Sequence, residues 1–229
     1  VGKNDLTIEH LLLDSRRIFA PATSLFFALK GSRRDGHQFI PELYKRGVRA
    51  FILSEAIDIA IFPEAAFLMV KDTLSALQQL AAYHRQQFNI PFIAITGTNG
   101  KRSTKELIHA VLSAQYKTYT TEGNLNNHIG IPLTILKVKP DAEIAVIEMG
   151  ANHQKEIEGY CKYTLPTHGL ITNCGKAHLE GFGGAEGVRK GKGELFDYLR
   201  TNNGTAFIMQ DYDYLLQMSK GISSIIKYG

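Results

Sequence analysis

Short apolar segments alternate along the chain with stretches in which apolar residues recur every three or four positions. In the stretch 73–87, for example, Leu74, Leu77, Leu80 and Ala81 share one helical face. The predicted strands are 24–29, 50–53, 67–70, 92–96, 144–148, 169–172 and 206–209. The predicted helices are 38–46, 73–87 and 104–113, and residues 188–199 begin another. Several strands are apolar on both faces, which indicates an α/β fold with a parallel sheet covered by helices.

A fresh strand begins after Pro91, and this places a domain boundary near residues 88–91. The sequence is therefore expected to form two domains, 1–88 and 89–229. Its hydrophobic share of 44% and charged share of 21% are ordinary for a globular protein with a sizeable core. The most apolar stretch, 56–70, is interrupted by Asp58, Pro63 and Glu64, which argues against membrane insertion.

Net charge limits the kinds of binding partner to be expected, and cysteine content indicates the cellular compartment. The 26 Lys and Arg against 22 Asp and Glu leave a net charge of +4, and the basic residues are spread along the chain. That balance weakly favours anionic small molecules and lacks the clustered basic surface typical of nucleic-acid binding. Cys161 and Cys174 are too few for a disulfide framework and indicate reduced thiols in a cytoplasmic protein.

The segment GTNGK, residues 97–101, lies between a predicted strand and a predicted helix. In that context a glycine loop presents backbone N–H groups and the positive end of the helix dipole to phosphate. Lys101 adds a point charge for the outer phosphates. The first glycine of the full Walker pattern is replaced by Ile95, so this is the shorter G-x-x-G-K version. The alternative is a Gly/Asn turn before a helix with a surface lysine.

The residue after Lys101 breaks the phosphate-loop pattern. A Ser or Thr hydroxyl normally ligates magnesium there, but this chain has Arg102. Ser103 cannot simply replace that hydroxyl, because one residue along a helix is a rotation of about 100°. The Arg102 guanidinium has donors only, so we expect it to pair with a phosphate or to bridge to Glu148.

Polar residues also follow the other apolar strands. Glu148 ends the strand 144–148, and Asn173 and His178 follow the strand 169–172. Ligands of open parallel sheets bind beyond the carboxyl ends of the strands, where a carboxylate and a histidine are reasonable metal ligands. A solvated strand-end acid and a structural histidine are the alternatives. Downstream, Arg189, Lys190 and Lys192 on one helix are, by spacing alone, a solvated face.

Taken together, these motifs resemble the Mur ligase family of peptidoglycan synthesis. The resemblance rests on GTNGK (97–101), EMGANH (148–153), TNCGKAHLEGFG (172–183) and KGELFDYL (192–199). These enzymes use ATP to form amide bonds on a UDP-N-acetylmuramoyl nucleotide. GNLNNHIGIPLT (123–134) and IEMGANHQKEI (147–157) are most similar to the branch that adds D-alanyl-D-alanine to the UDP-N-acetylmuramoyl-tripeptide. LLLDSRR (11–17), SLFFALKG (24–31) and RDGHQFIPELYKRGVRAFI (34–52) are similar to that branch's uridine-nucleotide domain.

The resemblance implies a role for specific residues. ATP would be bound by Gly97, Thr98, Asn99, Gly100, Lys101, Arg102, Ser103, Asn173 and Asp211. Two Mg²⁺ ions would be held with the help of Glu148, His178 and a carbamylated Lys192, and Lys101, Lys192 and His178 would be the catalytic residues. The substrate would be bound by Ser15, Arg16, Lys30, Asp35, Gly36, His37, Asn126, Asn127 and His128.

The implied chemistry begins with attack of a substrate carboxylate on the ATP γ-phosphate, and an amine then displaces the resulting acyl phosphate. The implied fold is a small α/β uridine-nucleotide domain followed by a P-loop-type parallel-sheet ATPase domain that is incomplete. The family's C-terminal Rossmann-like domain has no counterpart here, so the chain alone is expected to lack ligation activity. The protein is also expected to be a monomer. In FIMQDYD (207–213) only Asp211 keeps the family pattern, since Met209 replaces the usual Asn.

Other functions remain open at this point. One is the related ligase that adds the third residue of the peptide. A folate polyglutamate ligase lacks a uridine-nucleotide domain, so SLFFALKG and RDGHQFI argue against it. A third alternative is a nucleotide-sugar-binding module with an impaired ATPase, and Arg102 is the feature that favours it.

Overall fold

Two compact units, Val1–Leu77 and Gln78–Gly229, make up the chain. They are seen in a computed structural model that describes residues 5–31, 34–175 and 179–229. The division falls inside helix α2 (Thr73–Gln86), earlier than the boundary expected near 88–91. The reason is that the second half of α2 is built into the second unit, where Ala81 and Arg85 are buried.

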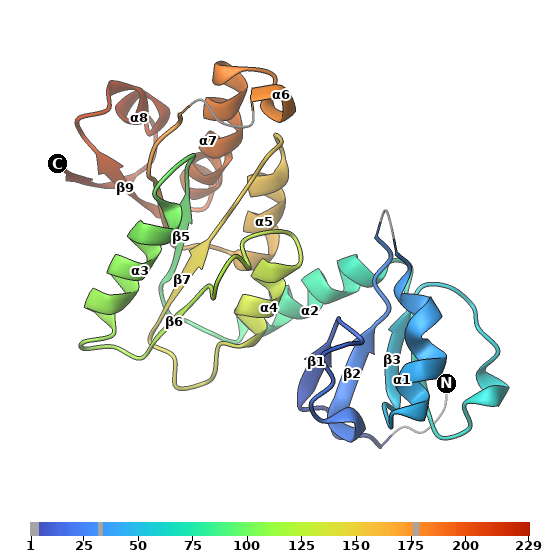
Figure 1. The fold of residues 1–229 in the computed structure, drawn as a ribbon. Coiled ribbons are helices and arrows are strands. Elements are labelled where there is room, and N and C mark those ends of the chain that lie inside the picture. Colours follow the sequence, from blue (N-terminus) through green and yellow to red (C-terminus); the bar gives the residue numbers. More distant parts are fainter. Residues whose placement is uncertain (1–4, 32–33, 176–178) are drawn as a thin grey trace. The chain divides into compact units, whose positions relative to one another are not determined.

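The first unit is a four-stranded parallel sheet in the order β1-β2-β3-β4 (Figure 1). Its strands are β1 (His10–Leu12), β2 (Ser24–Phe27), β3 (Ala50–Leu53) and β4 (Ala66–Met69), and its helices are α1 (Ile40–Lys45) and three short 3-10 turns at Pro21–Thr23, Gly36–Phe39 and Ile59–Ile61. Aromatic residues in register across the strands form the core. Phe26 pairs with Phe51, which stacks on Phe67 with ring centroids 5.3 Å apart.

The second unit is a six-stranded parallel sheet in the order β10-β9-β8-β5-β7-β6. Its strands are β5 (Phe92–Thr96), β6 (Thr118–Thr120), β7 (Ile144–Glu148), β8 (His168–Ile171), β9 (Thr205–Met209) and β10 (Ser224–Tyr228). Its helices after α2 are α3 (Lys101–Leu112), α4 (Gly130–Leu136), α5 (Glu156–Thr164), α6 (Leu179–Phe182), α7 (Ala185–Thr201) and α8 (Asp213–Met218). The predicted α/β fold with parallel sheets is confirmed.

Alternation along the strands divides the core of this sheet into two layers. On β5, Phe92 and Ala94 join the larger hydrophobic cluster, which also contains residues of α4, α5 and α7. Ile93 and Ile95 point to the opposite face, where α3 supplies Ile108. Figure 1 shows α3 on one side of the sheet and α4 and α5 on the other. Helices on both faces explain why the central strands are continuously apolar.

The strands predicted at 50–53, 92–96 and 144–148 are confirmed residue for residue. The helix predicted at 104–113 begins earlier, at Lys101, because Gly100 adopts a left-handed φ of 80° and ends the loop there. The predicted helix 38–46 is divided into a 3-10 turn and α1. Within the described residues, no helix has the length and apolar character needed to cross a membrane.

Candidate functional site

The loop between β5 and α3 requires glycine at two positions. Gly97 has a φ of 145°, and a Cβ there would collide with the Thr172 hydroxyl. Gly100 has a φ of 80° and leads directly into the first turn of α3. Both values lie in the region that L side chains rarely adopt. The loop therefore brings its backbone to the N-terminus of α3 in the arrangement that binds phosphate.

Residues that follow β8 brace this loop. Asn173 accepts from the Thr98 N–H through its backbone oxygen at 2.9 Å and from the Asn99 N–H through Oδ1 at 3.1 Å. The Thr172 hydroxyl donates to the Asn99 carbonyl at 2.6 Å. Asn173, predicted to bind the nucleotide, therefore contacts the loop that would hold it. Positions distant in sequence fix the loop before any ligand binds.

Lys101 lies over the same loop. Its ammonium donates to the carbonyls of Gly97, at 2.7 Å, and Thr98, at 3.0 Å. Burial lowers the pKa of Lys101, while the nearby Glu148 carboxylate opposes that shift. Two neutral carbonyls therefore hold the Lys101 ammonium at the loop. A bound phosphate could replace them as its hydrogen-bond partner.

Glu148, at the end of β7, is buried, with 3% of its surface exposed. Its Oε1 accepts from the Asn126 side-chain amide at 2.7 Å. Its Oε2 is buried and, within the described residues, has no hydrogen-bond partner. A buried carboxylate oxygen without a partner is costly unless it is protonated or meets a cation. A divalent cation of the kind that carboxylates bind would fit this donor.

Lys192, on α7, is 2% exposed and donates to the Ala151 carbonyl at 3.0 Å. Burial, reinforced by the charge of Lys101, lowers its pKa to about 8. The alternative of a solvated face is therefore excluded for Lys192, which the resemblance had singled out. It holds for Arg189 and Lys190, which are exposed. Burial disfavours the charged form, so a fraction of the Lys192 amine is neutral near pH 8.

Beside the glycine loop lies a cavity of about 350 Å³, whose lining does not include Asn99, Gly100, Glu148 or Asn173. From the predicted residues it brings together Gly97, Thr98, Lys101, Asn126, Asn127, His128 and Lys192. Glu156, Tyr160 and Phe182 also line it, although sequence reasoning did not single them out. Glu156 lies at the start of α5, where its carboxylate accepts from the N–H groups of Asn152 and His153. The motif 147–157 contained this residue, but no pattern distinguished it from a surface acid.

Other predicted nucleotide and metal residues lie elsewhere. Ser103 and Asp211 are exposed and are absent from the lining of this cavity. Arg102 donates to the Gly123 carbonyl at 2.7 Å. The expected bridge from Arg102 to Glu148 is not found within the described residues, because Glu148 is buried whereas Arg102 is exposed. His178 lies outside the residues that the structure describes.

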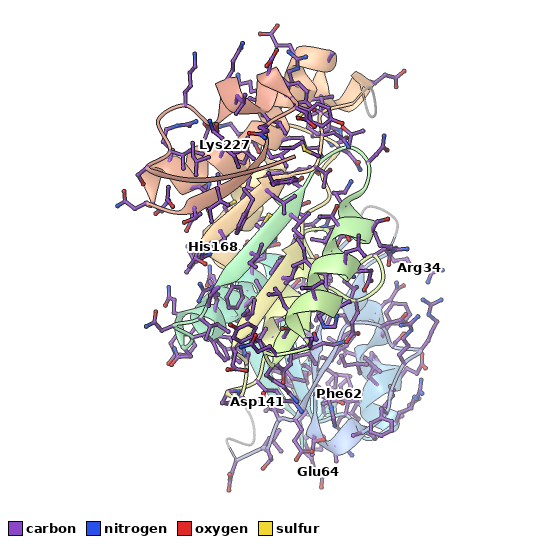
Figure 2. All side chains as sticks on the ribbon, turned by 90° about the vertical axis from the view of Figure 1, so that its left-hand side faces the viewer. Arg34, Phe62, Glu64, Asp141, His168 and Lys227 are labelled. Atoms are coloured by element: carbon purple, nitrogen blue, oxygen red, sulfur yellow. The ribbon has the colours of Figure 1, made fainter. Side chains whose placement is uncertain are left out.

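The first unit has a cavity of its own, about 310 Å³ in volume. Ser15, Arg16 and Gly36 from the predicted substrate set line it, together with Asp14 and Arg34. Arg16 pairs with Asp14 at 2.7 Å. Figure 2 shows the Arg34 side chain extending away from the ribbon. Because Arg16 is paired with Asp14, Arg34 is the cation that favours an anion in this cavity, and the sequence pattern had missed it.

The remaining predicted substrate residues of this unit form an internal network. Lys30 forms ion pairs with Glu55 and Asp35. His37 is bonded to Asp35 through Nδ1, and its Nε2 accepts from the Ser54 N–H at 3.0 Å. With both ring nitrogens in use, His37 holds two loops together. Lys30, Asp35 and His37 do not line the cavity beside them.

Comparison with protein families matches both units. Residues 95–229 match the family model described as Mur ligase middle domain. Residues 7–85 match the one described as Mur ligase family, catalytic domain.

Curated relatives agree with these matches. The chain is 43% identical over 220 residues to the UDP-N-acetylmuramoyl-tripeptide--D-alanyl-D-alanine ligase of Escherichia coli (strain K12), which covers 96% of this chain and 47% of that protein. It is 41% identical over 202 residues to the protein of the same name from Bacillus subtilis (strain 168), covering 88% and 43%. The chain thus spans about half the length of the curated relatives it matches.

Solved structures are similar over the same extent. The crystal structure of MurF from Acinetobacter baumannii superposes with a TM-score of 0.89 at 37% identity, covering 97% of this chain and 48% of that one. The MurF ligase from Thermotoga maritima in complex with ADP gives a TM-score of 0.87 at 29% identity, covering 99% and 52%. With family models matched in both units, the chain belongs to the Mur ligase family.

Proposed function

We propose that this chain provides the nucleotide-binding and UDP-substrate-binding portions of an ATP-dependent ligase. The reaction would join D-alanyl-D-alanine to a UDP-N-acetylmuramoyl-tripeptide in peptidoglycan precursor synthesis. The cavity that gathers Lys101, Lys192 and Asn126 beside a glycine loop carries the proposal. The names of relatives up to 43% identical to this chain support the choice of substrates. We also propose that the protein acts as a monomer in the cytoplasm, where ATP is available.

The reaction requires two anions to meet. The terminal carboxylate of the tripeptide attacks the γ-phosphorus of ATP, the bond to the bridging oxygen breaks, and ADP leaves with that electron pair. The amine of D-alanyl-D-alanine then displaces inorganic phosphate from the acyl phosphate and loses a proton. Lys101 and the N–H groups at the start of α3 would stabilise the charge on the transferring phosphoryl group.

Magnesium, when bound, would neutralise phosphate charge and orient the phosphoryl group for in-line attack. Glu148 fits such an ion through its unpartnered Oε2, and a carbamylated Lys192 would add a second carboxylate-like ligand. The Asn126 amide fixes the orientation of the Glu148 carboxylate. We propose that Asn127 and His128, beside it in the cavity, face the muramoyl substrate.

Calorimetric titration tests the proposal. We expect saturable heat with ADP. Lys101→Met should reduce the affinity for ADP at least tenfold, because one charge-assisted contact contributes roughly 1.5–3 kcal/mol.

We also expect the UDP-N-acetylmuramoyl-tripeptide to bind more tightly than the corresponding dipeptide. Preference for the dipeptide would favour the ligase that adds the third residue. Absence of heat with every UDP-muramoyl nucleotide would remove the ligase assignment. Normal UDP-substrate binding without any nucleotide binding would favour the non-catalytic nucleotide-sugar module.

A second prediction concerns the Lys192 amine. Its pKa of about 8 leaves a substantial neutral fraction at pH 8, and only the neutral amine reacts with CO₂ to form a carbamate. We expect a carbamate carbon signal by NMR after incubation with ¹³C-bicarbonate, weakening as the pH falls below 8 and the amine becomes protonated. Lys192→Arg should abolish the signal. Lys190→Arg, at an exposed position on the same helix, should retain it, and equal loss in both variants would contradict the prediction.

A further inference from the structure

Helix α3 holds the segment that leads from β6 to the cavity at two points. We call residues 121–129 the cavity loop. Lys105 donates to the Thr121 carbonyl at 2.6 Å, and Arg102, one turn earlier on the helix, donates to the Gly123 carbonyl at 2.7 Å. Residues three apart lie on the same side of a helix, so both cations reach the same stretch of chain.

The contacts made by Lys105 and Arg102 differ in their exposure to solvent. Lys105 is 1% exposed, so its contact with Thr121 belongs to the packed interior. Arg102 is exposed, and its contact with Gly123 is accessible to solvent. Gly123 has a φ of 55°, a left-handed turn that suits glycine and directs the chain onward to Asn126. Arg102 therefore contacts the cavity loop three residues before Asn126, which lines the cavity.

The residues beyond Gly123 are the ones that shape the cavity. The Asn126 amide orients Glu148, and its backbone carbonyl accepts from the Gly150 N–H at 2.7 Å. The Asn127 side chain accepts from the N–H groups of Ile129 and Gly130 and so starts α4. A displacement at Gly123 would thus be passed to the carboxylate of Glu148 and to the cavity wall.

The chemistry of Arg102 explains why it takes this role. The position follows the phosphate-loop lysine, where a hydroxyl normally ligates magnesium. A guanidinium offers donors only and stays protonated, so it cannot ligate a cation. It can, however, bond a carbonyl too distant for a hydroxyl. In this chain the side chain after Lys101 contacts protein that shapes the cavity.

We propose that Arg102 is a positioning residue that ties the phosphate-binding end of α3 to the cavity loop. Ordering of α3 by a bound nucleotide would then be transmitted to Asn126 and its neighbours. The effect of the nucleotide on the cavity loop rests on the proposed function. The tie between α3 and the cavity loop rests only on the contacts of Arg102 and Lys105. The residue thereby couples the nucleotide side of the site to the substrate side.

Hydrogen exchange followed by mass spectrometry tests the tie without ligand. In Arg102→Met, which keeps the length and removes the donors, we expect exchange across residues 124–128 to accelerate roughly tenfold, equivalent to about 1.4 kcal/mol. Exchange near Thr121 should be unchanged, because Lys105 still holds that carbonyl.

Arg102→Lys should restore most of the protection of residues 124–128. Val111→Ala, at a 73% exposed position farther along α3, is the control and should match the wild type. Unchanged exchange in Arg102→Met would overturn the tie.

Exchange with ADP, in the absence of magnesium, tests the transmission. In the wild type we expect ADP to protect both residues 97–101 and residues 124–128. In Arg102→Met it should protect only residues 97–101, a difference that simple destabilisation of the loop would not produce. Equal protection of the cavity loop in both proteins would overturn the coupling. If ADP protects neither segment in the wild type, the proposed nucleotide site fails, and the ligand-free experiment alone decides the tie.

Discussion

Replacing Arg85 by alanine is expected to lower the free energy of unfolding of the second unit by about 3 kcal/mol or more. Arg85 lies on α2 and is 6% exposed. Its guanidinium donates to the carbonyls of Thr164, at 2.9 Å, Leu165, at 3.0 Å, and Phe88, at 2.8 Å. It also lies over the Phe92 ring, 3.8 Å from the centroid. Removal would take this donor from the buried Thr164 carbonyl and from the partly buried carbonyls of Phe88 and Leu165, and an unsatisfied buried acceptor costs more than its contact contributes.

Chemical denaturation measures this effect. Arg85→Lys should recover only part of the stability, because an ammonium cannot match the fork of a guanidinium on three acceptors. Arg17→Ala, at an exposed arginine of the first unit, is the matched control and should change stability by no more than about 0.5 kcal/mol. Since the acceptors are neutral carbonyls, added salt should hardly alter the loss. A loss below about 1 kcal/mol would show that water or neighbouring groups replace the guanidinium.

Replacing Arg102 by threonine is expected to strengthen magnesium-dependent nucleotide binding by roughly 1.5–3 kcal/mol, the value of one charge-assisted contact. The wild-type guanidinium is committed to the Gly123 carbonyl and cannot ligate the metal. Phosphate contacts from Gly97 to Lys101 do not depend on this side chain. Arg102→Thr also loses the contact with Gly123, so binding of ADP without magnesium should be no tighter than in the wild type, and only the magnesium-dependent part of the affinity should gain.

Arg102→Val separates the two causes of such a gain. Valine has the shape of threonine but lacks the hydroxyl, so it removes the cation without supplying a ligand. Titration of each protein with ADP, with and without magnesium, should show the gain in Arg102→Thr only. An equal gain in Arg102→Val would assign the effect to removal of charge. If the wild type already binds magnesium–ADP as tightly as Arg102→Thr, the site tolerates the arginine and the prediction is wrong.

Much of the fold was predictable because the central strands are buried on both faces. Strands β3, β5 and β7 are continuously apolar, and their limits were found to the residue. The strands that were missed lie at sheet edges. β6 is the sequence Thr-Tyr-Thr, and β10 has only two consecutive apolar residues, Ile225 and Ile226, so neither has an apolar run long enough to detect. β1, at the edge of the other sheet, has only three residues.

The candidate site was predictable where chemistry is local. The glycine loop and Lys101 are consecutive in sequence, and the carboxyl ends of parallel strands bring Glu148 to the same edge. Contacts between distant segments were not predictable. Asn173 braces Asn99 from 74 residues away, and Asn126 orients Glu148 from 22 residues away. No periodicity encodes such pairs, because each depends on how separate loops meet above the sheet.

The sequence by itself determined the alternation of strands and helices, the phosphate loop and the replacement of its hydroxyl by Arg102. These features depend on backbone preference and on periodic burial, which neighbouring residues express directly. Only the tertiary structure showed that Lys192 is buried while Arg189 and Lys190 are exposed, and that the Arg102 guanidinium contacts Gly123 rather than Glu148. The charge state of Lys192 depends on desolvation, and the partner of Arg102 depends on which acceptor its side chain can reach. Both are set by the packing of segments far apart in the chain, so the local sequence does not contain them.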